Sequence, residues 1–276
     1  MAFELPEAVT LASQMDAELR GKMIHQVVLS PDCASLIRQG FVNLDRVDLS
    51  GKTIRQVDSQ GKWIFIHLEP DWNLMLAIES SGRILYQRPG EPRPDKFRAR
   101  LEFADGSALT VHIIAWGFVR AARDGELASL NYPGQLGLSP VDRRQLTPNA
   151  FDGILDRSPK KILKVILTDQ RTLAGIGIGY LQDILYRARL HPGRKAASLA
   201  APERQTLFDA IFETLGQAVR LGGSAFEVDL YGRPGGYVRR MGSHLQGQPC
   251  PVCGALIQKV SVSGAACFIC PSCQSQ

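Results

Sequence analysis

Four cysteines near the end of the chain restrict its fold more than any other feature of the sequence. They form two Cys-x-x-Cys pairs separated by sixteen residues. Two residues between ligands allow a tight turn to aim both sulfurs at one tetrahedral ion, so the spacing predicts a closed four-thiolate zinc site. Because protein fills all four positions, no position is open for a substrate and the predicted Zn²⁺ is structural. The ligands are Cys250, Cys253, Cys270 and Cys273.

The alternative to zinc is a pair of disulfides, which needs an oxidising compartment. No charged start followed by an apolar run and a small-residue cleavage site precedes the body of the chain, so we expect reduced thiols in the cytoplasm. Cys33 and Cys267 lie off the ligand spacing and are interpreted as packing residues.

Length and charge set the next limits. A chain of 276 residues with 45% hydrophobic content can form two domains, and no stretch approaches the roughly 20 apolar residues of a membrane span. From Arg143 onward the chain has 17 Lys and Arg against 9 Asp and Glu, a charge of +8, whereas residues 1–142 have 15 against 18, a charge of −3. This asymmetry favours a polyanionic partner for the second half, although solvated basic faces are also common.

The first half is predicted to be mainly strands. Residues 62–68 alternate in hydrophobic pattern, and residues 98–103 and 108–113 flank a turn at Asp105 and Gly106 that favours a hairpin. Several short strands of this kind indicate a sandwich or barrel, with one early helix at about residues 6–20.

The second half has helical periodicity. Leu207, Ile211, Leu215 and Val219 recur every four residues before two glycines that end the helix. Two earlier helices are expected, one within residues 160–169 and one after the glycines of residues 175–179. The Pro- and Gly-rich residues 131–140 mark the predicted domain boundary.

The sequence GIGIG at residues 175–179 has three interpretations. Glycines let backbone N–H groups approach an oxyanion at a helix N-terminus. The segment lacks a P-loop lysine and a βαβ setting, which argues against a nucleotide cofactor. A turn that admits a nucleic-acid backbone is favoured, and plain helix packing is the alternative.

Taken together, these segments resemble the formamidopyrimidine-DNA glycosylase and endonuclease VIII family. The similarity rests on ELPEAV, LTDQRTLAGIGIGYLQDILYRARLHP, GGSAF and the cysteine segment, in that family's order across nearly the whole chain. It implies an α+β fold in three parts and a double-stranded, damaged DNA partner. The parts are an N-terminal β-sandwich at residues 1–130, a helix-two-turn-helix domain at 131–240 and a four-cysteine zinc finger with a β-hairpin at 241–276.

The resemblance also shows what this chain lacks. In the family an N-terminal proline amine attacks the sugar and forms a Schiff base, and an adjacent glutamate moves protons. The glutamate position falls on Glu4 and the proline position on Phe3, with two residues before it. Phe3 has no nucleophilic side chain and its nitrogen is an amide, so the family's first covalent step is absent. If Met1 is removed, the α-amine of Ala2 is the substitute nucleophile to consider.

Other family positions are also altered. Ile178 stands where the family has an asparagine that contacts phosphate, and Ala265 stands at the position of the finger arginine. Side chains that fill the space of a flipped base align with Ser80 and with Ala115 and Trp116, so only the aromatic wedge remains.

Several DNA-contacting positions are retained. Lys62 matches a family phosphate contact, Lys160 and Lys161 precede the helical turn, and Tyr180 follows it. Arginines and tyrosines also alternate with glycines in YGRPGGYVRRMG, which suits a loop near phosphates or an extruded base. Each residue also has an ordinary structural explanation, as a surface lysine, a core tyrosine or a surface loop. The arginines of this loop are Arg233, Arg239 and Arg240.

Three functions follow. The first is a monomeric DNA-binding protein, associated with the nucleoid when bound, that has lost or altered the family's proline-dependent glycosylase and lyase chemistry. The second is an active DNA glycosylase and abasic-site lyase that uses the Ala2 amine or a lysine together with Glu4. The third is a zinc-containing module that binds RNA or protein. The sequence does not decide whether the chain is an enzyme.

Overall fold

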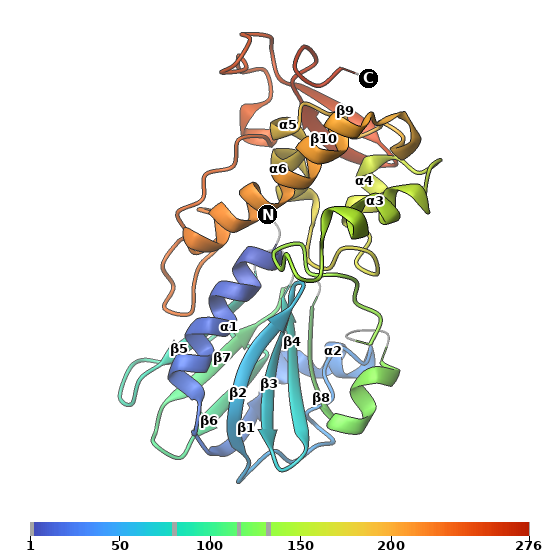
Figure 1. Cartoon of the computed structure of the whole chain (residues 1–276). Coiled ribbons are helices and arrows are strands. Elements are labelled where there is room, and N and C mark those ends of the chain that lie inside the picture. Colours follow the sequence, from blue (N-terminus) through green and yellow to red (C-terminus); the bar gives the residue numbers. More distant parts are fainter. Residues whose placement is uncertain (1–2, 79–81, 115–116, 131–133, 276) are drawn as a thin grey trace. The chain divides into compact units, whose positions relative to one another are not determined.

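The computed structural model in Figure 1 describes residues 3–275 except 79–81, 115–116 and 131–133. Strands dominate the first part of the chain and helices the second, which confirms the predicted α+β class. None of the helices in the described residues has the length and apolar character needed to cross a membrane.

The chain forms two compact units, which are described separately. The second unit includes both the helices and the zinc finger. Leu221–Gly236, which the sequence analysis placed in the helical domain, packs with the β-rich unit. The three-part division therefore stays a prediction. The first unit comprises Met1–Gln135 and Leu221–Gly236, and the second Leu136–Arg220 and Tyr237–Gln276.

Two antiparallel four-stranded sheets form the first unit. Their strand orders are β1-β6-β7-β5 and β2-β3-β4-β8. Apolar residues of both sheets and of α1 share one buried cluster, as a β-sandwich requires. The elements are α1 (Leu5–Leu19), β1 (Ile24–Leu29), α2 (Ala34–Arg38), β2 (Thr53–Gln60), β3 (Trp63–Glu69), β4 (Trp72–Ile78), β5 (Arg83–Gln87), β6 (Ala99–Phe103), β7 (Ala108–His112) and β8 (Gly117–Arg123), with 3-10 turns at Pro31–Cys33 and Asp124–Ser129.

The predicted strands, hairpin and early helix are present. β6 and β7 pair as a hairpin, and the Asp105 carboxylate accepts the Ser107 N–H at 3.0 Å within the turn. Gly106 has φ +85°, a left-handed conformation that glycine adopts without strain.

A network of hydrogen bonds links polar side chains on the outer face of the sheet β2-β3-β4-β8. His67 Nδ1 lies 2.6 Å from Asn73 Oδ1, Asn73 Nδ2 donates to Asp124 at 2.6 Å, and His67 Nε2 lies 2.9 Å from Asp58. Because the Asn73 amide donates to Asp124, its oxygen accepts from His67. The carboxylate of Asp58 also accepts, so these contacts are both satisfied as hydrogen bonds only when the two ring nitrogens donate, which is the protonated form of the imidazole. The hydrogen bond to Asp58 is the main reason that the pKa of His67 is raised.

This network predicts that stability depends on pH. With its pKa raised in the folded state, His67 stabilises the fold fully below its unfolded pKa of about 6.5. That contribution is lost as pH rises through the folded value. His67→Gln should therefore lower stability at acidic pH by about 1 kcal/mol and flatten the profile, measured by urea unfolding between acidic and alkaline pH. The control is His25→Gln, at an exposed position on β1. A wild-type slope that persists in His67→Gln would contradict the assignment.

The second unit has a helical core and a terminal hairpin. Leu207, Ile211 and Leu215 of α6 are buried as predicted, and the helix ends before Gly222 and Gly223, which have φ of +73° and +89°. The elements are α3 (Pro148–Asp156), α4 (Leu163–Thr168), α5 (Ile178–Arg187), α6 (Ala201–Arg220), β9 (Gln258–Val262) and β10 (Ala265–Ile269), with 3-10 turns at Ala196–Ser198 and Ser243–Leu245.

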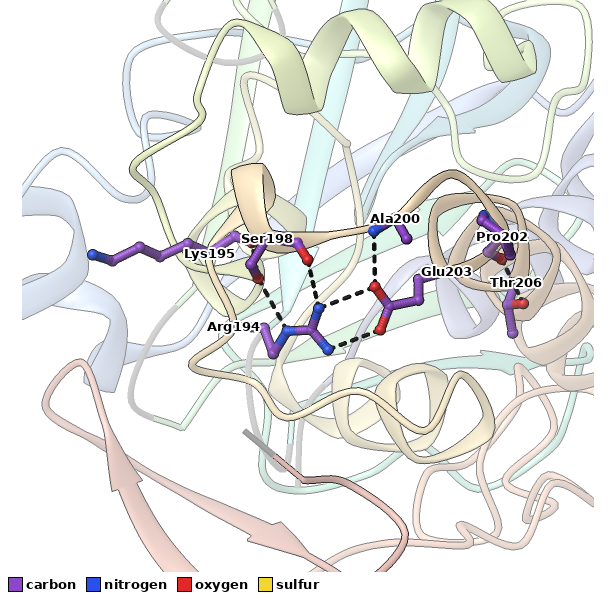
Figure 2. Close-up of polar contacts among 7 residues, drawn as sticks. All are labelled: Arg194, Lys195, Ser198, Ala200, Pro202, Glu203 and Thr206. Carbon is purple, nitrogen blue, oxygen red and sulfur yellow. Dashed lines mark hydrogen bonds and ion pairs between the residues drawn. The ribbon is translucent and has the colours of Figure 1, made fainter.

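Figure 2 shows how the connection before α6 is fixed. Arg194 Nη1 and Nη2 donate to the two carboxylate oxygens of Glu203 at 2.8 and 3.0 Å, and Glu203 also accepts the Ala200 N–H at 2.8 Å. The Arg194 guanidinium is the main cause of the lowered pKa of Glu203. Lys195 points away from this network and is exposed.

Candidate nucleic-acid interface

The start of the described chain is buried in the β-rich unit. The side chain of Phe3 is 3% exposed and belongs to the sandwich core. Glu4 is 1% exposed and is the N-cap of α1, where it forms a capping box with Glu7. Glu4 thus has a structural role in addition to the proton transfer that the resemblance implies.

Glu7 joins the start of α1 to a segment that is distant in sequence, and sequence reasoning missed it. One carboxylate oxygen accepts the Glu4 N–H at 3.0 Å and the other accepts the Ser224 N–H at 2.8 Å. A Cβ at Gly223 would lie 3.0 Å from the Glu7 carboxylate, so the close approach favours glycine. A Glu three residues after the N-cap is the sequence signal of a capping box. That signal could have predicted the bond to Glu4 but not the bond to Ser224.

Other predicted residues of the first unit are less informative. Ala2, Ser80, Ala115 and Trp116 lie outside the described residues. Lys62 is half-buried, and its Nζ lies 5.6 Å from the ring centroid of Trp63.

The glycine turn begins α5 in the second unit. Gly177 is the N-cap and Ile178 the first helical residue. Tyr180 is 0% exposed, with its ring centroid 5.5 Å from that of Tyr237. Tyr180 therefore occupies the core, which was the structural alternative for this residue.

Arg239 lies against this turn. Its guanidinium carbon is 5.6 Å from the Tyr180 ring centroid, and a Cβ at Gly179 would lie 2.6 Å from the same group. Nε and Nη2 of Arg239 are shielded from solvent and have no hydrogen-bond partner in the described part of the chain. The arginine is thus fixed at the first turn of α5 with unused donors.

A buried carboxylate holds the arginine segment in place. Asp183 of α5 accepts the Tyr237 hydroxyl at 2.7 Å and the N–H groups of Arg240 and Met241 at 3.0 and 2.7 Å. Burial raises the pKa of Asp183, opposed by these hydrogen bonds and by the charge of Arg239. The side chain of Arg240 is exposed. Asp183 was not identified from the sequence.

Lys160 and Lys161 are both exposed in the turn before α4. Ile162 forms an antiparallel bridge with Lys195, so a third exposed lysine lies next to them. The sequence alone did not place Lys195 in this group, because 34 positions separate it from Lys161.

The four cysteines of the finger come together as predicted. Their sulfur atoms all lie within 4.8 Å of one another, with 3.9 Å between Cys250 and Cys273 and 3.3 Å between Cys253 and Cys270. Zinc–sulfur bonds of about 2.3 Å in a tetrahedron imply sulfur separations of about 3.8 Å, which these distances bracket. The four thiols hold one structural zinc ion.

The crowding of the four sulfur atoms explains why a cation belongs there. Burial alone would raise the pKa of Cys250, but hydrogen bonds, chiefly from the Tyr186 hydroxyl at 3.2 Å, lower it to about 6. Burial and the neighbouring sulfurs raise the pKa of Cys273 to about 12. Four sulfurs so close together repel as thiolates, and Zn²⁺ neutralises that repulsion. Cys33 and Cys267 are each 0% exposed, which confirms them as packing residues.

Three side chains fasten the finger to the helices. Lys164 of α4 donates to the backbone oxygens of Val262 and Ala265. Gln182 of α5 accepts the Phe268 N–H at 2.7 Å. Gln274 donates to the Leu190 oxygen at 3.0 Å. These contacts fix the hairpin turn, where Ala265 is exposed; its alignment with a family arginine stays a prediction.

The β-sandwich, the helical unit with its glycine turn and the four-cysteine hairpin define a zinc-finger protein of the DNA glycosylase class, and comparisons with known proteins support this. Family models match in the same order: the formamidopyrimidine-DNA glycosylase N-terminal domain at residues 3–112, its H2TH domain at 136–229 and the zinc finger found in FPG and IleRS at 247–276. The formamidopyrimidine-DNA glycosylase of Thermus thermophilus is 32% identical over 279 residues, covering 99% of this chain and 98% of the relative. The chain belongs to the formamidopyrimidine-DNA glycosylase family.

A second relative and two solved structures agree. The formamidopyrimidine-DNA glycosylase of Bacillus cereus is 29% identical over 282 residues and 98% of each chain. The MutM (Fpg) structure from Thermus thermophilus aligns with a TM-score of 0.85 and 30% identity over 99% of both chains. A Lactococcus lactis Fpg bound to DNA containing an abasic site aligns with a TM-score of 0.85 and 26% identity, covering 99% of this chain and 100% of the other.

Proposed function

We propose that this protein binds damaged double-stranded DNA and does not perform the family's proline-dependent chemistry. The observation that carries the proposal is the burial of Phe3 in the sandwich core at the family's proline position. Its nitrogen is a peptide amide, and an amide nitrogen does not form a Schiff base with an aldehyde.

The means of binding DNA remain. Asp183 positions the backbone of Arg240, whose side chain is exposed beside the α5 turn, and Lys160 and Lys161 are also exposed. Phosphate contacts from Arg and Lys set the position of a protein on a duplex without reading its sequence. Relatives of similar fold were solved with DNA containing an abasic site or carbocyclic 8-oxo-G, which supports damaged DNA as the partner. The expected monomeric state and nucleoid association stay predictions.

One experiment tests both parts of the proposal. Binding to an abasic duplex is measured between about 50 and 200 mM salt, and the same mixture is treated with borohydride. We expect affinity to fall steeply over this range, because Lys and Arg displace counterions, and we expect no covalent adduct. A family member with its N-terminal proline provides the positive control for trapping.

The other outcomes identify the alternatives. An adduct mapped by mass spectrometry to Ala2 or to a lysine would show an active lyase with a substitute amine and overturn the loss of chemistry. Weak DNA binding that is insensitive to salt would overturn the DNA partner and favour an RNA- or protein-binding module.

A further inference from the structure

A basic cavity lies on the outer face of the sheet β1-β6-β7-β5. Arg83 of β5 and His112 of β7 are register partners, and Leu85 is paired with Thr110 in the same ladder. Their neighbours Ile84 and Val111 are core residues. Because side chains alternate along a strand, the first four side chains point away from the core. The cavity has a volume of about 330 Å³ and is lined by Arg83, Leu85, Pro94, Lys96, Thr110, His112 and Ile114.

The lining has positive charge with no acid to balance it. No Asp or Glu is among the described residues that form the wall. Arg83 and Lys96 are exposed, and neither makes an ion pair within the described ranges. The nearby Arg98 contacts Asp32 at 3.5 Å and donates to the Ile113 oxygen at 3.1 Å.

The pKa of His112 is consistent with a positive electrostatic potential in the cavity. Burial, followed by the charges of Arg98, Arg83 and Lys96, lowers the pKa of His112. Its Nδ1 is shielded from solvent and has no hydrogen-bond partner among the residues that the structure describes. A buried polar atom without a partner is rare in a folded protein. Because Nδ1 is shielded, a ligand in the cavity could contact the His112 ring only through Nε2.

The cavity also has an apolar wall and a volume that suit a small ligand. Leu85, Pro94 and Ile114 give it an apolar wall, and Ile114 is 55% exposed at the rim. The volume lies at the lower end of the roughly 300–1,000 Å³ typical of small-ligand sites. Cations beside an apolar wall suit an oxyanion attached to a carbon skeleton.

From this arrangement we infer that the cavity binds a sugar phosphate through Arg83, Lys96 and His112. The assignment of DNA as the source of that phosphate rests on the proposed function, whereas the phosphate chemistry does not. The net negative charge of residues 1–142 concealed the cavity in the sequence, because its cations lie on separate strands and a loop.

The test uses the full-length zinc-loaded protein with ¹³C-labelled histidine side chains. The chain has five histidines, and His112→Gln identifies the signal. Inorganic phosphate and a short abasic duplex are titrated separately. Either ligand should shift the His112 resonance and raise its pKa, because an anion favours the imidazolium form. The double variant Arg83→Gln/Lys96→Gln should abolish the shift. It should also reduce the slope of log affinity for DNA against log salt by about 1 for each phosphate that the protein no longer neutralises.

The control removes the same charge elsewhere on the unit. Arg38→Gln/Arg55→Gln changes two exposed arginines outside the cavity and should leave the His112 shift intact. A shift with phosphate but not with the duplex would retain the site and assign it to free phosphate esters. A His112 signal unmoved by both ligands would overturn the site, and DNA binding in that sample would show that the proposed function survives. If phosphate shifts the His112 signal but the protein does not bind DNA, the phosphate site survives and the proposed function fails.

Discussion

Replacing Cys253 with alanine is expected to remove the zinc and unfold the finger. Three remaining thiols cannot close the tetrahedron, and the hairpin β9–β10 has a small core of its own. That core contains Tyr186, Met241, Cys250, Ile257, Phe268 and Cys270. Zinc content measured by mass spectrometry should fall from one ion per chain to near zero, and amide exchange in β9 and β10 should become fast.

The expected effect is large because metal binding and folding of such a site are one process. Structural Zn²⁺ contributes about 10–16 kcal/mol of apparent binding free energy in zinc-finger peptides. Ordinary core truncations cost about 2–5 kcal/mol. The hydrogen bonds of Lys164, Gln182 and Gln274 join the helices to the folded finger, so they are lost when it unfolds.

The matched control is Cys267→Ala in the same hairpin. Cys267 is fully buried but lies outside the ligand group. This variant should keep one zinc ion per chain and lose only packing energy, about 1 kcal/mol. If Cys253→Ala retained stoichiometric zinc and slow exchange in β9, the four-thiolate site would be wrong.

The sequence predicted the parts of the fold that depend on local chemistry. The hairpin followed from Asp105 and Gly106, and the buried face and C-terminal end of α6 followed from a four-residue apolar repeat ended by two glycines. The zinc site followed from ligand spacing alone. In each case the signal and the structure lie within a few residues or in one short segment, so no knowledge of tertiary contacts was needed.

Long-range polar contacts gave no such signal. Glu7 and Ser224 are 217 positions apart, and their bond attaches the segment after α6 to the β-rich unit. The resemblance placed Tyr180 at the DNA interface, yet its side chain is in the core. Summing charge over each half of the chain concealed the cavity around Arg83 and Lys96, because strand pairing and a loop, not sequence proximity, bring those residues together.

Asp183→Ala should destabilise the second unit more than any other single polar substitution described above. The change leaves the N–H groups of Arg240 and Met241 and the Tyr237 hydroxyl without their acceptor. It also removes the negative charge beside Arg239. Breaking a buried charged network by deleting one partner costs about 3–5 kcal/mol. Urea unfolding should show this loss, and the amides of residues 237–241 should lose protection from exchange.

Two neighbouring variants separate the carboxylate from the packing around it. Tyr237→Phe deletes one hydroxyl while keeping the ring against Tyr180, so it should cost about 1 kcal/mol. Asp183→Asn keeps one acceptor oxygen but places an amide donor next to backbone N–H groups, so its cost should fall between the other two. Since the same carboxylate orders the segment that contains Arg239 and Arg240, DNA affinity should decrease in this order as well. Equal stability losses for Asp183→Ala and Tyr237→Phe would show that the two backbone bonds contribute little, and that the arginine segment is positioned by packing alone.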